Sequence, residues 1–172
     1  MKEIRWHARA GQGAKTASQL YATALLHNGQ SVQAFPEYGP ERRGAPLRAY
    51  TRVDDKPIRR HDAITRPDVV VVLEPSLLSE VDVAEGLAPG GFVLINAETP
   101  PESLAGVDVR CVPGSHLAGD SKFVNLVLVG ALAAALHEPM EAVVDAAVEL
   151  LGAKVAHDDI QAAVEKGYGW QS

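Results

Sequence analysis

The sequence has a single cysteine, few aromatic residues and no long apolar run. Cys111 stands alone among 172 residues, which excludes an internal disulfide and a cysteine cluster for an iron–sulfur or zinc site. The longest apolar stretch, 123–136, contains Asn125 and Gly130 and is too short to span a bilayer, so it predicts a buried helix. Residues 1–6 lack the apolar core of a signal peptide, and we therefore expect a cytoplasmic protein.

Positive charge is also scarce. Lys and Arg number 16 against 22 Asp and Glu, giving a formal net charge of −6, which argues against a general nucleic-acid binder. A hydrophobic content of 47% with 22% charged residues is ordinary for a soluble globular domain. The length favours one domain over residues 1–172 with a substantial core. No acid–base or metal-ligand spacing is present, so we expect neither a catalytic nor a metal-binding residue in this chain.

The hydrophobic periodicity predicts alternating strands and helices. Strands are predicted at 2–8, 31–35, 47–53, 69–73, 92–96 and 107–112. Helices are predicted at 17–25, just after Pro75, at 121–136, at 139–151, and from an Asp158 or Asp159 cap to Tyr168. The turn at 54–57 predicts a hairpin with 58–60, which would make the sheet mixed. The pattern indicates the α/β class, as a Rossmann-like three-layer sandwich with a mostly parallel, mixed sheet.

A glycine turn, Gly11-Gln12-Gly13-Ala14-Lys15-Thr16, separates the first strand from the first helix. It fails the P-loop pattern because an alanine separates the second glycine from the lysine. It fits a dinucleotide fingerprint only at the two glycines, since a threonine stands at the third position, although Glu37 follows the second strand. Backbone N–H groups at a helix start can bind a phosphate or carboxylate. The same turn could instead serve close packing of strand and helix.

The stretch 35–52 combines rigid turns with positive charge. Its prolines are Pro36, Pro40 and Pro46, and its arginines are Arg42, Arg43, Arg48 and Arg52. The prolines predict an ordered, non-helical loop up to the strand. In the strand, alternation places the side chains of Arg48, Tyr50 and Arg52 on a cationic, aromatic outer face. Such a segment suits an anion or a partner surface. Alternatively, its arginines pair with Glu37 and Glu41.

The segments 6–13 and 35–46 together resemble one family, and the resemblance extends over nearly the whole chain. It includes the turn 54–58, the valine strand with Glu74-Pro75, and 125–130 on the late apolar helix. The family is that of the gamma subunits, or fused gamma domains, of thiamine-diphosphate-dependent 2-oxoacid:acceptor oxidoreductases such as pyruvate:ferredoxin oxidoreductase. Ala8 and Ala10 depart from the glycine-richer turn that is usual in the family.

This resemblance implies a cytoplasmic hetero-oligomer of anaerobic metabolism with alpha, beta and delta-type subunits. Such a complex oxidatively decarboxylates a 2-oxo acid to an acyl-CoA and passes electrons to ferredoxin or another acceptor. Thiamine diphosphate, Mg and [4Fe-4S] clusters are implied on the partner subunits. This chain is expected to handle coenzyme A and to dock subunits, without contact with nucleic acid or membrane, and to be inactive when isolated.

The residues expected to contact coenzyme A are the glycine turn and the arginines of 35–52. They are Gly11, Gln12, Gly13, Lys15, Thr16, Arg42, Arg43, Arg48 and Arg52. A second hypothesis is a free-standing Rossmann-like dinucleotide-binding protein, based on Gly11, Gly13 and Glu37.

Other polar residues are interpreted from their neighbours in the sequence. His7 is interpreted as a polar strand-face residue and Cys111 as a small buried hydrophobe. His116, with 114–115 and 119–122, precedes a helix and could line a cleft. The segment 59–61, Arg-Arg-His, is interpreted as a solvated or subunit-facing patch.

Overall fold

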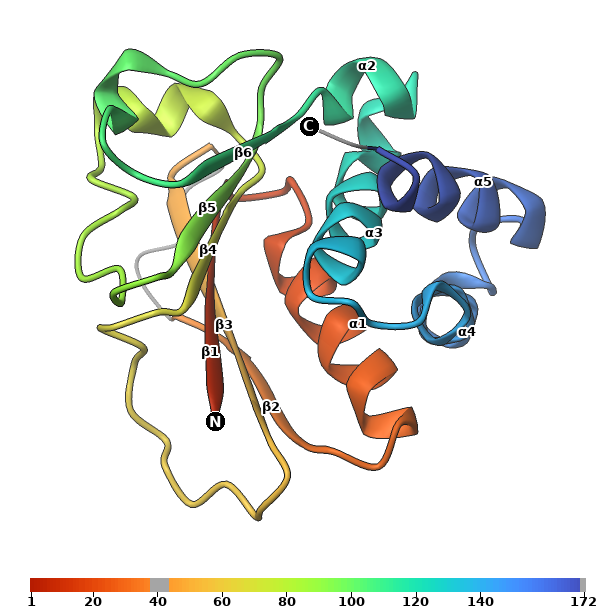
Figure 1. The fold of residues 1–172 in the computed structure, drawn as a ribbon. Helices are drawn as coiled ribbons and strands as arrows, with labels where there is room; N and C mark the ends of the chain where they lie inside the picture. The colour runs from red at the N-terminus through yellow and green to blue at the C-terminus, as the bar shows by residue number, and fades with distance from the viewer. Residues whose placement is uncertain (38–43, 171–172) are drawn as a thin grey trace.

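The computed structural model describes residues 1–37 and 44–170 and contains a six-stranded sheet of order β2-β3-β1-β4-β5-β6 (Figure 1). The strands are β1 Lys2–Arg9, β2 Ser31–Pro36, β3 Pro46–Asp54, β4 Val69–Val72, β5 Phe92–Asn96 and β6 Val109–Val112. The pairs β1/β4, β4/β5 and β5/β6 are parallel, whereas β3 runs antiparallel to both β1 and β2. The predicted α/β class with a mostly parallel, mixed sheet is confirmed.

Helices cover one face of this sheet. They are α1 Ala14–His27, α2 Gly114–Ala118, α3 Val124–Ala135, α4 Met140–Leu151 and α5 His157–Tyr168. Figure 1 shows α1, α3, α4 and α5 together on one side. On the other side lie irregular segments with the 3-10 turns η1 Pro75–Ser79 and η2 Glu102–Leu104; a third turn, η3 Ser121–Phe123, leads into α3. This second outer layer is built mostly of short turns.

The central strands are buried on both faces. Val71 and Leu94 belong to the core under the helices, while Val70 and Val93 belong to a separate core under the 3-10 layer. A continuous β-branched run suits such a strand, because neither of its faces meets water. The prediction of a central strand at 69–73 is therefore confirmed.

The predicted hairpin at 54–57 is wrong. Residues 58–60 form no strand, and the sheet is mixed because β3 lies antiparallel between β1 and β2. Residues 55–68, here called the strap, instead connect β3 to β4 without regular structure. The strap is held by Ile64, which is 2% exposed, and by a hydrogen bond from Arg52 to the Asp62 carbonyl. Hydrophobic periodicity does not report such side-chain anchors.

One helix start and one whole helix also differ from expectation. Ala156 is the N-cap of α5, so Asp158 and Asp159 lie in its first turn and do not cap it. Their carboxylates still favour the positive end of the helix dipole. The short helix α2 was not predicted, because its five residues are too few to show a periodicity.

Candidate functional site

An open cavity of about 540 Å³ lies at the carboxyl ends of β1, β4 and β5. Its lining comprises Gly11, Gln12, Gly13, Leu73, Glu74, Asn96, Ser115, Ser121, Lys122, Val124 and Asn125. In open α/β sheets, ligands bind in the crevice beyond the carboxyl ends of the strands. The volume is also within the range of small-molecule sites. The glycine turn thus forms one wall of a candidate ligand cleft and faces the segments that lead into α2 and α3.

The two glycines of the turn have different surroundings. Gly13 starts α1 with φ +84°, and a β-carbon there would lie 2.8 Å from the amide nitrogen of Asn125. Asn125 is fixed because its Oδ1 accepts a hydrogen bond from the Leu126 N–H at 2.9 Å. A β-carbon on Gly11 would meet no atom within 4 Å among the described residues. Gly13 therefore serves close packing, whereas Gly11 borders open space.

Gln12 ties the turn to the end of β4. Its Nε2 donates to Glu74 Oε2 at 2.7 Å, and its Oε1 accepts from the Arg9 N–H at 2.8 Å. Partial burial alone would raise the pKa of Glu74, but hydrogen bonds from Gln12 and from Ser76 outweigh it. The net effect lowers the pKa, so Glu74 contributes a negative charge to the cavity wall at neutral pH.

The facing wall is built on Asn96, the last residue of β5. The Asn96 Nδ2 donates to the Leu73 carbonyl at 3.0 Å and to Ser115 Oγ at 2.9 Å, and its Oδ1 accepts from the Ser115 N–H at 3.0 Å. Lys122 supplies a cation to the lining and pairs with Asp120 at 3.2 Å. The wall is therefore pre-organised and rich in amide and hydroxyl groups.

Sequence reasoning found part of this wall. The expectation that His116 lies in a loop and lines a cleft is wrong, because His116 belongs to α2 and is not in the lining, whereas its neighbours Ser115, Ser121 and Lys122 are. The sequence pattern did not identify Glu74, Asn96 and Asn125 as site residues. An asparagine at the end of an apolar strand, or within an apolar helix, was the available signal, since buried amides need fixed partners.

The predicted coenzyme A residues are dispersed in the structure. Gly11, Gln12 and Gly13 line the cavity, whereas Lys15 and Thr16 lie on the first turn of α1, outside its lining. Arg42 and Arg43 lie outside the described residues. Of the remaining two, Arg48 is partly exposed and its guanidinium lies 3.9 Å from the Glu37 carboxylate. This contact matches the ion-pair alternative for the loop.

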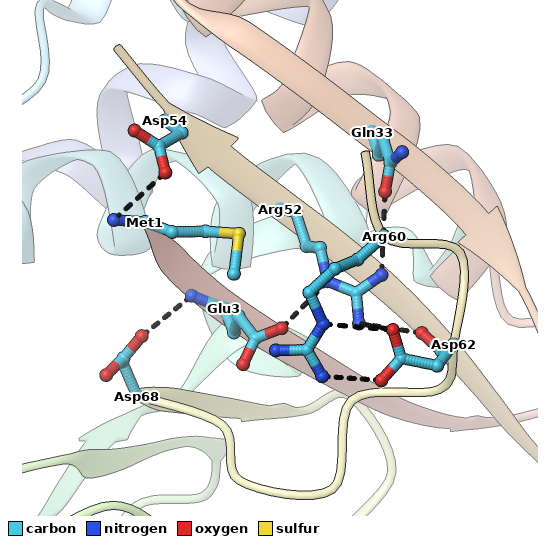
Figure 2. Close-up of polar contacts among 8 residues, drawn as sticks. All are labelled: Met1, Glu3, Gln33, Arg52, Asp54, Arg60, Asp62 and Asp68. Carbon is cyan, nitrogen blue, oxygen red and sulfur yellow. Dashed lines mark hydrogen bonds and ion pairs between the residues drawn. The ribbon is translucent and has the colours of Figure 1, made fainter. Parts of the chain in front are cut away.

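Arg52 is buried and bound within the chain, so it is not available to a ligand (Figure 2). Its side chain is 0% exposed, and its Nε donates to Glu3 Oε1 at 2.7 Å. Its Nη2 donates to the Asp62 carbonyl at 2.7 Å, and the guanidinium also lies over the Phe35 ring. The assignment of Arg52 to a coenzyme A site is therefore wrong, because a buried charge needs these partners to remain in the core.

The cationic, aromatic outer face predicted for β3 is covered at Tyr50 and Arg52, and only Arg48 remains partly exposed. Tyr50 is 2% exposed and donates to Glu37, while the facing residues of β1, Arg5 and His7, are equally buried. Arg5 donates to His7 Nε2 at 3.0 Å. Desolvation first, and then the charges of Arg5 and Arg48, lower the pKa of His7 to about 3. His7 is a strand-face residue as expected, but it is a neutral acceptor in a buried polar layer.

Arg9 holds the described end of the 35–46 loop beside the glycine turn. Its Nη1 donates to the Gly44 carbonyl at 3.1 Å, and the Ala10 N–H donates to the Ala45 carbonyl at 2.9 Å. The same guanidinium pairs with Glu80 at 2.6 Å. Gly44 and Ala45, at the described end of the loop, therefore lie beside the glycine turn that borders the cavity, and Arg9, which was not among the predicted site residues, fixes that arrangement.

Over residues 1–37 and 44–170, no three His, Cys, Asp or Glu side chains are grouped to hold a metal ion. Within that part of the chain, no helix is long and apolar enough to cross a membrane. Cys111 is 8% exposed and burial raises the pKa of its thiol, which confirms the interpretation as a small core residue.

Comparison with known proteins gives one consistent family. Residues 3–170 match the family described as pyruvate ferredoxin/flavodoxin oxidoreductase. The common gamma subunit of the pyruvate/ketoisovalerate oxidoreductases of Thermococcus kodakarensis is 49% identical over 130 residues, which is 76% of this chain and 70% of that protein. The pyruvate synthase subunit PorC of Thermotoga maritima is 57% identical over 94 residues, 55% of this chain and 48% of that protein.

Solved structures agree with these matches. The crystal structure of the Thermotoga maritima pyruvate oxidoreductase subunit PORC superposes with a TM-score of 0.82 at 36% identity, covering 97% of this chain and 94% of that one. The 2-oxoglutarate:ferredoxin oxidoreductase of Magnetococcus marinus has a TM-score of 0.78 at 17% identity. That match covers 96% of this chain but 29% of the larger protein, and it shows the fold alone.

Proposed function

Because the chain belongs to the pyruvate ferredoxin/flavodoxin oxidoreductase family, we propose that it is the gamma subunit of a 2-oxoacid:acceptor oxidoreductase complex. The observation that carries this proposal is the match over residues 3–170, together with relatives named as gamma or PorC subunits. The family membership confirms the resemblance seen in the sequence.

The proposed complex cleaves a 2-oxo acid, releases CO₂ and transfers the acyl group to the sulfur of coenzyme A. Two electrons leave through iron–sulfur clusters to ferredoxin or another acceptor. Thiamine diphosphate, bound with Mg on partner subunits, supplies the carbanion stabilisation for decarboxylation. The single, buried Cys111 cannot ligate a cluster, which takes several thiolates. The role assigned to this chain is coenzyme A handling and subunit docking, and we expect it to be inactive alone.

The cavity suits the neutral part of coenzyme A better than its phosphates. Ser115, Ser121 and Asn125 offer hydroxyl and amide groups, which match the amides and hydroxyl of a pantetheine arm. Glu74 places a negative charge in the wall, and Lys122 is already paired with an aspartate, so neither favours a phosphate there.

The phosphates are assigned to Arg42 and Arg43, with Lys15 and the start of α1. Arg42 and Arg43 lie outside the described residues, and their assignment rests on the sequence. Guanidinium groups bind phosphate oxygens as bidentate donors. The hydrogen bonds that hold Gly44 and Ala45 next to Arg9 and Ala10 support this division, because they bring the end of the loop to the cavity.

Arg43→Ala should raise the KM for coenzyme A of the assembled complex. Loss of one charge-assisted hydrogen bond costs about 1.5–3 kcal/mol, or roughly a 10- to 150-fold increase. The measurement is steady-state oxidation of the 2-oxo acid at varied coenzyme A, with Lys154→Ala, an exposed lysine before α5, as control. Cluster content and thiamine diphosphate content should match those of the wild type. If the variant fails to assemble while residual complex keeps its KM, these arginines belong to a subunit interface.

The alternative of a free-standing dinucleotide-binding protein was based on three residues, and two of them are engaged in contacts within the chain. Glu37, the acid expected to meet a ribose, accepts a hydrogen bond from Tyr50 and lies beside Arg48. The space at Gly13 is filled by the Asn125 amide. Only Gly11 still fits that reading.

A further inference from the structure

The strap, residues 55–68, carries a strip of exposed basic side chains that the proposed coenzyme A site does not use. The strip consists of Arg59, Arg60, His61 and Arg66, all exposed, and Lys56 near the start of the strap is exposed as well, in a chain of formal charge −6. Arg60 is paired with Asp62. Within residues 1–37 and 44–170, neither Arg59 nor Arg66 forms an ion pair, so their charges face solvent. Asp55, at the start of the strap, is the other exposed acid of this segment.

A buried arginine fixes the middle of the strap to the sheet. Figure 2 shows Arg52, on β3, between Glu3 of β1 and Asp62 of the strap. Besides its bond to the Asp62 backbone carbonyl, Arg52 lies 3.5 Å from the Asp62 carboxylate. Arg60 donates to both oxygens of the same carboxylate, through Nε and Nη2. Hydrogen bonding from Arg60 is the main cause that lowers the pKa of Asp62 to about 2. These contacts hold the middle of the basic strip to the sheet at Asp62.

The end of the strap is fixed as well. Asp68 Oδ2 accepts from the Glu3 N–H at 2.7 Å, and the Ala88 N–H donates to the Pro67 carbonyl at 2.9 Å. A β-carbon at Gly86 would lie 2.1 Å from the Thr65 carbonyl oxygen, so the neighbouring backbone packs directly against the strap. A connection of this length without regular structure that is nevertheless anchored along its course is commonly functional.

The strap lies apart from the glycine-turn cavity. Its anchors Glu3 and Asp68 are at the amino ends of β1 and β4, whereas the cavity is at the carboxyl ends. Figure 1 shows the strap, in yellow, extending from the sheet on the side away from the helices. It is thus a second surface, suited to contact a different partner.

We propose that the strap is a pre-formed docking surface for an acidic surface patch of a companion subunit. This inference rests on the proposed function, because it assumes a hetero-oligomeric complex. The guanidinium groups are spread along an exposed segment and do not converge on the cavity, which favours a protein surface over a small anion. The net charge of −6 opposes a nucleic acid. A segment ordered before binding loses little conformational entropy on docking, and exposed charges of this kind set association rate and salt dependence.

The test is assembly of the complex from co-expressed subunits with the double variant Arg59→Glu/Arg66→Glu. Lys154→Glu/Lys166→Glu is the matched control, because these lysines are exposed elsewhere and both variants take the formal charge from −6 to −10. We expect the strap variant to associate at least tenfold more weakly than wild type and control at low salt. The difference should shrink at about 0.5 M salt, where screening is strong. Thermal unfolding of the variant chain should match the wild type, since the two arginines form no ion pair in the described structure.

Three outcomes would overturn the inference. Equal assembly of strap variant and wild type at low salt would show that the strip does not dock a subunit, while leaving the gamma-subunit proposal intact. Normal assembly combined with lost binding of the chain to an oligonucleotide or anionic vesicles would assign the strip to a polyanion. A weakening shared equally by the lysine control would show a general charge effect. Absence of any complex with the wild-type chain would instead contradict the proposed function.

Discussion

Replacing Arg52 by methionine should lower the free energy of unfolding of the chain by about 3–5 kcal/mol, because it leaves a partly buried carboxylate without its partner. The Glu3 side chain is 14% exposed and accepts a hydrogen bond from Arg52 Nε at 2.7 Å, and the Asp62 carbonyl accepts one from Arg52 Nη2. Methionine keeps much of the side-chain volume, so lost packing is a small part of the expected effect. The measurement is equilibrium denaturation by urea.

Two further variants isolate the cause. Arg60→Met removes an exposed ion pair to Asp62 on the same strap, and such pairs contribute about 0–1 kcal/mol. Glu3→Gln/Arg52→Met removes both buried charges and should recover a large part of the loss, since neutral groups can replace a buried ion pair at little cost. If Arg52→Met costs no more than Arg60→Met, the buried pair does not anchor the strap.

Gly167→Ala should destabilise the chain, although alanine is the better helix former by about 1 kcal/mol. A β-carbon at Gly167 in α5 would lie 1.9 Å from the Val127 carbonyl oxygen of α3, and one at Gly130 would lie 2.3 Å from the Val164 carbonyl oxygen. The two helices therefore pack backbone to backbone and would have to separate. Overpacking typically costs about 1–3 kcal/mol, and a contact this short with rigid backbone belongs at the upper end, which corresponds to a fall in Tm of about 6–12 °C for a chain of this size.

Gly169→Ala is the matched control for that variant. Gly169 has φ −79°, which alanine adopts freely, and the nearest atom to a β-carbon there is the Glu165 carbonyl oxygen at 3.3 Å. We expect its Tm to stay within about 2 °C of the wild type. A Gly167→Ala protein that melts at or above the wild-type temperature would contradict the close α3–α5 contact.

The regular elements were predictable because each carries a local signal. The valine run at 69–72 reflects a strand buried on both faces, and the structure has β4 there. The helical spacing from Ala17 to Leu25 reflects a helix buried on one face, and the structure has α1 there. The strap was not predictable, since its position depends on Arg52, Glu3 and Asp62 meeting from three separate segments. Alternation alone predicted that Arg52 faces solvent, whereas the strap covers its side chain.

The site shows the same division. The glycine turn was found because its composition is unusual, and Gly11 does border the cavity. Asn96 and Asn125 were missed because each contributes through contacts across the fold, with Ser115 and with Gly13 respectively. A local sequence pattern can predict a turn. It does not identify the residues opposite that turn, because they come from strands and helices far away in the sequence.

The measurement that tests the central claim most directly is isolation of the native assembly through a tag on this chain. The account predicts a brown hetero-oligomer in which the chain accompanies companion subunits, with iron–sulfur absorbance and coenzyme A-dependent oxidation of at least one member of a panel of 2-oxo acids. A colourless homo-oligomer of this chain that binds NAD and oxidises none of them would contradict it.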